Sequence, residues 1–113
     1  MSDITIQKAE KGSVSVLVVS GKLDAKTAPQ LSNELQSLLA GGHKKIVCEM
    51  KGVSYIASAG VGTLKAALVE ARKGGGDVRL AALTNEVQDV FDVLGFSKLF
   101  TISGDLNTAL ADF

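Results

Sequence analysis

Hydrophobic and polar positions along the chain follow two periods. Short runs rich in β-branched and aliphatic residues are typical of buried strands, whereas apolar positions repeated at i, i+3, i+4 and i+7 are typical of amphipathic helices. The strand-like runs are residues 4–9, 14–20, 44–50, 78–83 and 99–102. Helical patterns begin near residues 27, 59, 84 and 105. The chain therefore has the predicted element order ββαβαβαβα.

The connections between these segments predict how the strands pair. The first two strand-like runs are separated by Glu10–Ser13, which has the polar, glycine-containing character of a hairpin loop, so they should pair antiparallel. After this hairpin each strand is followed by a helix, which favours parallel strands with right-handed crossovers. We therefore expect one α/β domain over residues 1–113, with a mixed sheet of about five strands and four helices.

Several residues mark the predicted helix ends. Thr27–Gln30 fits a capping box with Pro29 in the first turn, and Gly41–Gly42 supplies a left-handed stop. Thr84 and Asp105 are the expected caps of the last two helices. Each helix should turn one apolar face to the core; for the third helix the spacing selects Val87, Val90, Phe91 and Leu94.

Residues 53–65 form the stretch of greatest functional interest, because an apolar strand there gives way to a helix through small residues. Ser58 lies at this junction. Its hydroxyl can cap the helix by accepting a hydrogen bond from a free N–H of the first turn. The same position also suits a modifiable hydroxyl, since the small neighbours would let another protein approach closely. These neighbours are Ala57, Ala59, Gly60 and Gly62.

Composition excludes several classes of function. The 12 basic and 12 acidic residues cancel, and there is no tryptophan, so the chain lacks both the charge and the aromatic platforms expected of a nucleic-acid binder. No apolar run is long enough to span a bilayer. The single cysteine, Cys48, and the absence of a signal-like N-terminus favour a reducing cytoplasm.

The same residues offer little for catalysis or cofactor binding. The one histidine, His43, lies in a polar turn, and with Cys48 it forms no ligand set of metal spacing and no base for Ser58. Gly60–Lys65 superficially resembles a phosphate-binding turn, but it lacks the wider spacing of a P-loop, and glycines that permit close packing are the alternative. We expect no catalytic residue, no metal, no cofactor and no enzyme activity.

Two motifs resemble the STAS domain, and within it the stand-alone bacterial anti-sigma factor antagonists. Gly21–Asp24, followed by Ala28 and Leu31, is similar to the Gly-Glu-Leu-Asp turn and helix of that family. Residues 49–62 are similar to its signature Asp-Leu-Ser-x-Val-x-Phe-Ile-Asp-Ser-Ser/Ala-Gly-Leu-Gly. The order of strands and helices also matches, so the resemblance covers nearly the whole chain.

The resemblance implies a partner switch. In the family, the unphosphorylated protein binds an anti-sigma factor that is also an ATP-binding serine kinase of the histidine-kinase-like type. That kinase phosphorylates the serine aligned with Ser58, which releases the complex, and a metal-dependent serine phosphatase reverses the step. The implied partner-binding residues are Gly21, Asp24, Tyr55, Ala57, Ser58, Ala59, Gly60, Gly62 and Thr63. The expected free state is a cytoplasmic monomer that contacts neither membrane nor nucleic acid directly.

The chain departs from the family pattern at three positions. Ala57 stands where the family has Asp before the phosphorylated serine, Lys22 replaces Glu, and Glu49 replaces Asp. Because the carboxylate beside Ser58 is missing, a protein that binds its partner constitutively is one alternative. Thr63 and Ser54 are the other candidate phosphate acceptors. Two further alternatives share the fold: a STAS subunit of an ABC-type lipid transporter, and a nucleotide-binding protein that uses the turn beginning at Gly60.

Overall fold

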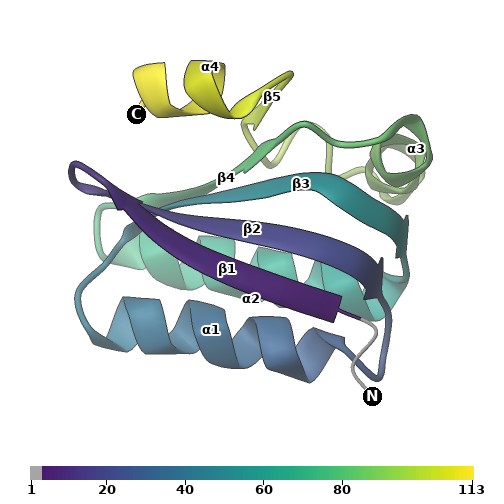
Figure 1. Cartoon of the computed structure of the whole chain (residues 1–113), viewed down its shortest axis with the longest axis horizontal. Coiled ribbons are helices and arrows are strands. Elements are labelled where there is room, and N and C mark those ends of the chain that lie inside the picture. Colours follow the sequence, from purple (N-terminus) through teal and green to yellow (C-terminus); the bar gives the residue numbers. More distant parts are fainter. Residues whose placement is uncertain (1–3) are drawn as a thin grey trace.

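The computed structural model describes residues 4–113 and has the predicted element order (Figure 1). The five strands are β1 (Ile4–Lys11), β2 (Val14–Leu23), β3 (Lys45–Ile56), β4 (Asp77–Ala81) and β5 (Ile102–Ser103). The four helices are α1 (Ala28–Ala40), α2 (Ser58–Lys73), α3 (Asn85–Leu94) and α4 (Leu106–Ala111). The predicted α/β class is therefore confirmed.

The strands form one mixed sheet in the order β1-β2-β3-β4-β5. β1 pairs antiparallel with β2, and every other neighbouring pair is parallel, as the hairpin and the alternation of strands and helices predict. Parallel strands end at the same edge of a sheet. The segments that follow β2 and β3 therefore emerge next to each other.

Both faces of the sheet are covered. α1 and α2 lie side by side on one face, and α4 lies on the other (Figure 1). The alternation of side chains along β3 reflects these two layers, because Ile46 and Cys48 join the main core whereas Val47 packs with α4. A strand buried on both faces has a continuous apolar middle, which is the pattern read in the sequence.

β3 extends six residues further than its predicted end at Met50. Its pairing with β4 stops at Glu49↔Ala81, so the last part of β3 has no strand on that side. α3 packs against β3 instead, with Val87 and Phe91 buried and the Phe91 ring in an edge-on contact with Phe100. This arrangement places α3 beside the strand that leads to Ser58.

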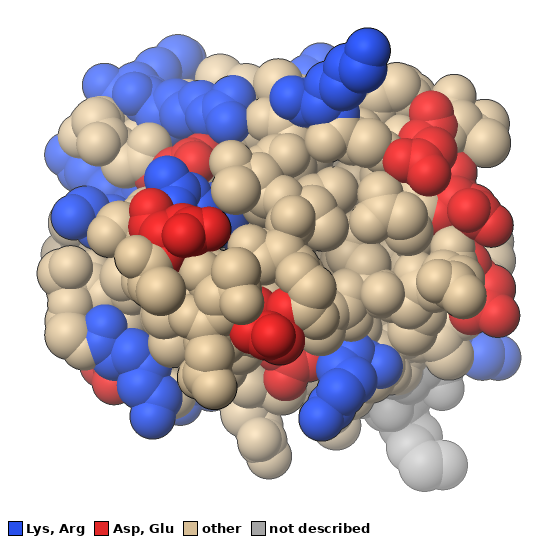
Figure 2. Space-filling model, turned by 90° about the horizontal axis from the view of Figure 1, so that it is seen from above, with Lys and Arg blue, Asp and Glu red and all other residues tan. Residues whose placement is uncertain are grey.

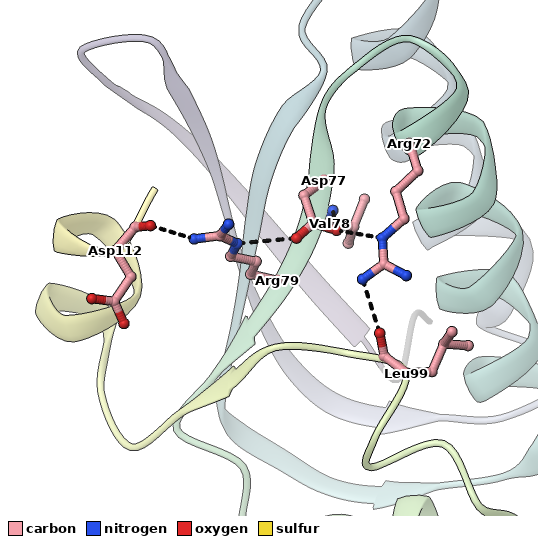
Figure 3. A network of polar contacts seen from close by, with 6 residues as sticks. All are labelled: Arg72, Asp77, Val78, Arg79, Leu99 and Asp112. Atoms are coloured by element: carbon pink, nitrogen blue, oxygen red, sulfur yellow. Dashed lines mark hydrogen bonds and ion pairs between the residues drawn. The ribbon is translucent and has the colours of Figure 1, made fainter.

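An ion-pair network fastens the opposite end of the sheet (Figure 3). The Asp77 carboxylate accepts hydrogen bonds from Arg72 Nε at 3.0 Å and from Arg79 Nε at 3.1 Å. Arg72 also donates to the carbonyl of Leu99 at 2.9 Å, and Arg79 to that of Asp112 at 2.7 Å. The network connects α2, β4, the segment before β5 and the C-terminal helix, so its role is structural.

Other predicted strand ends and one predicted cap were also wrong; β4, for example, ends at Ala81 and not at residue 83. The last strand spans Ile102–Ser103 and not residues 99–102, because Phe100 is buried in the core and the Leu99 carbonyl bonds to Arg72. Thr27 does not form a capping box, since its hydroxyl bonds to Asp24 N and Lys22 O and makes no cap hydrogen bond to the helix. The left-handed conformation of Gly42 and the caps made by Thr84 and Asp105 are confirmed, and Gly95, which is also left-handed, ends α3.

Candidate functional site

The strand ends bring together two segments that are far apart in the sequence. Leu23 pairs with Ile56 at the end of the β2–β3 ladder, and the N–H of Ala57 donates to the carbonyl of Leu23 at 2.9 Å. The loop that begins at Asp24 therefore lies directly beside the start of α2. The structure thus places two of the predicted contact residues, Asp24 and Ser58, at one edge of the sheet.

Ser58 is the first residue of α2 and is not its cap. Ala57 occupies the N-cap position, with φ −103° and ψ 169°, and its methyl group cannot accept a hydrogen bond. Its carbonyl accepts from Gly60 N at 2.9 Å and Val61 N at 3.2 Å. The expectation that Ser58 caps the helix was wrong because the turn closes one residue earlier.

The consequence is an exposed and unengaged hydroxyl at a helix N-terminus. Ser58 is solvent-exposed, and among residues 4–113 its hydroxyl has no hydrogen-bond partner. The amide N–H groups of Ser58 and Ala59 likewise have no acceptor there, and the first turn carries no acidic residue. Free N–H groups and the helix dipole make such a position favourable for negative charge. The hydroxyl is therefore free to react, and a phosphate on it would be tolerated by the helix.

Asp24 is held by its own loop. Its Oδ1 accepts hydrogen bonds from Lys26 N at 2.9 Å and from Thr27 N at 3.1 Å. The backbone hydrogen bond from Thr27 is the main cause that lowers the pKa of Asp24 below its usual value. The Thr27 hydroxyl closes the loop by bonding to Asp24 N at 2.9 Å and Lys22 O at 2.7 Å. Asp24 thus shapes the loop as well as presenting a carboxylate at its surface.

The glycines of the site have different roles. A Cβ on Gly60 would lie 2.7 Å from Leu23 Cγ and 3.0 Å from Ile56 Cγ1, so Gly60 lets α2 pack closely on the sheet. It is buried, and the expectation that it leaves room for a partner was wrong. A Cβ on Gly62 would meet no atom within 4 Å, so Gly62 leaves an open spot on the helix surface. Gly21 has φ +110° beside a register shift in the β2–β3 ladder, a backbone conformation that favours glycine.

The remaining predicted contact residues divide between two surfaces. Tyr55 is 52% exposed and stands close to Ser58, and Ala59 is also exposed. Thr63 is half-buried and lines a separate groove of about 470 Å³ between α1 and α2. It therefore does not share the surface of Ser58. Ser54 is exposed, and its hydroxyl is within 3.5 Å of the Gly21 carbonyl.

The structure adds a groove that sequence reasoning missed. It has a volume of about 520 Å³ and runs between the end of β3 and α3. Its walls are formed by Tyr55, Ile56, Ala57 and Ser58 on one side and by Asp89, Val90, Val93 and Leu94 on the other. Leu94 is 43% exposed, so its assignment to the core face was wrong, and Val93 is 85% exposed. The sequence offered one signal of this groove, because Val93 is apolar and yet lies outside the face of the helix that was predicted to contact the core.

The cysteine and the histidine, which are the usual candidates for nucleophilic or metal chemistry, lie away from this site. Cys48 is buried in the sheet, and desolvation raises the pKa of its thiol to about 12, so it stays protonated. His43 is exposed, with Nδ1 3.9 Å from Glu10 Oε1. Over residues 4–113 no three His, Cys, Asp or Glu side chains converge as metal ligands. Within the same range, no helix combines the length and apolar character needed to cross a membrane.

The fold agrees with the family comparison. The model of the STAS domain family matches residues 5–109, so this chain belongs to the STAS domain family. Over 85 residues it is 31% identical to the anti-sigma-B factor antagonist of Bacillus subtilis. The aligned region covers 75% of this chain and 77% of that protein.

Solved structures give the same result. An anti-sigma factor antagonist from Mycobacterium paratuberculosis superposes with a TM-score of 0.89 at 27% identity, over 96% of this chain and 92% of that one. The Bacillus cell fate determinant SpoIIAA in its phosphorylated form superposes with a TM-score of 0.76 at 18% identity, over 96% of this chain and 98% of its own. The second likeness concerns the fold alone.

Proposed function

We propose that this STAS-domain protein is an anti-sigma factor antagonist that works by partner switching. The unphosphorylated form binds an anti-sigma factor that is also an ATP-dependent serine kinase, and phosphorylation of Ser58 releases the complex. Relatives bearing the name anti-sigma factor antagonist support the first part. The single observation that carries the second part is the exposed Ser58 hydroxyl, which has no partner among the described residues.

The physical basis of the switch is a difference between the fold and the complex. A phosphate adds about −1.5 to −2 charges and three acceptor oxygens. At the first residue of α2 it meets the positive end of the helix dipole and free N–H groups, so the domain stays folded. In a tight complex the same group must lose its water, which is unfavourable unless the partner supplies matched cations. Loss of the complex then follows without unfolding.

The docking surface combines the Asp24 loop with the start of α2. Asp24 presents a carboxylate fixed by its loop, Tyr55 an exposed ring, and Gly62 an open helix surface. Ser58 is preferred over Thr63 as acceptor because Thr63 is half-buried in the separate groove between α1 and α2. A metal-dependent serine phosphatase would restore the binding form. A cytoplasmic location fits such a partner.

Two measurements test this function. Intact-mass spectrometry of the protein from its native host should show a phosphate-sized increase that is absent from a Ser58→Ala variant and present in Thr63→Ala. Affinity purification with Ser58→Ala as bait should recover an ATP-binding anti-sigma factor, whose purified form binds the unmodified chain and not Ser58→Glu. Recovery of a membrane transporter complex would instead favour the transporter alternative. Heat released when ATP or GTP is titrated into the protein would favour a nucleotide-binding role. Absence of phosphate under all growth conditions would refute the switch.

A further inference from the structure

The groove between β3 and α3 is partly acidic and partly apolar, and it opens onto Ser58. Its α3 wall consists of Asp89, Val90, Val93 and Leu94, which are paired at i, i+4 spacing and therefore share one side of the helix. Tyr55 and Ser58 face them across the groove. The exposed apolar residues Tyr55, Val93 and Leu94 thus lie together, which is uncommon for a surface without a partner.

The charged residues of α3 are all acidic. α3 contains three acidic residues, Glu86, Asp89 and Asp92, and no lysine or arginine. Asp92 is engaged by the Gln88 side chain at 3.1 Å and by Ser97. Glu86 and Asp89 have no hydrogen-bond or ion-pair partner among residues 4–113. Figure 2 shows acidic side chains gathered at the end of the molecule where α3 lies, with lysine and arginine more frequent toward the opposite end.

We propose that this groove is a docking site for a basic amphipathic segment of the protein that engages Ser58. The apolar residues of such a segment would cover Tyr55, Val93 and Leu94, and its lysine or arginine side chains would pair with Asp89 and Glu86. This combination follows from charge complementarity, since an apolar segment alone would leave both carboxylates without partners. An acidic segment would be repelled.

The groove also gives Ser58 a route to influence binding. Ser58 belongs to the wall opposite Asp89, so a phosphate there would stand in the space that the segment must fill. The apolar face of the segment would then have to desolvate a doubly charged group, because its lysine or arginine side chains are engaged by the carboxylates of α3, and this is unfavourable. The identity of the partner rests on the proposed function, whereas the chemistry of the groove does not. The partner and the groove can therefore be tested separately.

The first test measures affinity for the purified anti-sigma factor. Val93→Ser should weaken binding by about tenfold or more, as expected for a central apolar contact, and Asp89→Asn should weaken it less at high salt than at low salt. The matched controls are Val69→Ser, at an exposed valine of α2 outside the groove, and Glu70→Gln, at an exposed acid outside it. Each control should change affinity by less than about twofold.

The outcomes separate the two proposals. If Ser58→Glu abolishes binding while Val93→Ser and Asp89→Asn behave like their controls, the groove proposal is overturned and the switch stands. Because Val93 is 85% exposed, its substitution should leave the melting temperature unchanged, so a loss of affinity reports on the contact itself.

The second test needs no natural partner. Designed helical peptides of equal hydrophobicity, one carrying lysines and one carrying glutamates beside the apolar face, are added to the isotope-labelled protein. The basic peptide should shift the amide resonances of Tyr55, Asp89 and Val93, and the acidic peptide should leave them in place. Equal effects of both peptides, or none, would overturn the proposed chemistry even if the anti-sigma factor were never found.

Discussion

Replacing Ser58 with aspartate should stabilise the free domain. The residue begins a helix of 16 residues whose first turn carries no acidic side chain, and its cap position is an alanine. The N–H groups of Ser58 and Ala59 have no acceptor among the described residues. A carboxylate placed there gains from the helix dipole and from these free donors.

The size of the effect follows from the position. A negative charge in the first turn of an exposed helix stabilises by about 0.3–1 kcal/mol. For a chain of 113 residues the entropy of unfolding is roughly 240 cal/mol/K, so the melting temperature should rise by about 1–4 °C. Asp89 lines the same groove and repels the new charge, so adding Asp89→Asn should increase the gain.

Thermal unfolding followed by circular dichroism measures this change. Ser58→Asn is the matched control, because it has nearly the same shape and no charge. The difference between the two variants should shrink at 1 M salt, where the Debye length is about 3 Å. The helix N-terminus lowers the pKa of the introduced carboxyl, so its stabilisation is present above the unfolded pKa and is lost as the pH falls through the folded one.

A lower melting temperature for Ser58→Asp than for Ser58→Asn would refute this reasoning. A phosphate at the same position would then have to be regarded as disrupting the domain, and loss of the partner would follow from local unfolding. The expected rise instead separates the effect of charge on the complex from its effect on the fold.

Three further predictions concern residues of the same site. Gly60→Ala should destabilise the domain by about 1–3 kcal/mol because the added Cβ has no room, whereas Gly62→Ala should stabilise it by about 0.5–1 kcal/mol through helix propensity. Urea titrations that give both changes in the free energy of unfolding the same sign would contradict this difference in packing. Ala57→Asp should stabilise by about 1 kcal/mol by supplying the missing N-cap, measured in the same way, and Ala57→Leu, which cannot cap, should show no such gain. The pKa of Asp24 is lowered, so its contribution to stability is present above its unfolded pKa of about 3.8 and is lost as the pH falls through the folded value. Asp24→Asn should therefore flatten the dependence of melting temperature on pH below about 4, and an unchanged profile would contradict this.

The sequence by itself determined the class of fold and indicated the place of the candidate site. Strand runs separated by helical patterns favoured parallel crossovers after the first hairpin, because a helix between two strands provides the long connection that a parallel pair needs. The small residues around Ser58 marked the strand-to-helix junction, and the motif similarity identified the family. These features are local in the chain, or depend only on the order of its elements, so periodicity and spacing were enough to find them.

Only the tertiary structure decided which side chains face the solvent and which face each other. Gly60 and Gly62 are two residues apart in similar surroundings, yet one packs on Leu23 and the other is open, because successive helix positions point in different directions. Ser58 lost its expected role as cap by a shift of one residue, which no propensity resolves. The groove joins residues 55–58 to residues 89–94, a contact set by the packing of α3 on the unpaired end of β3, and no local pattern encodes it.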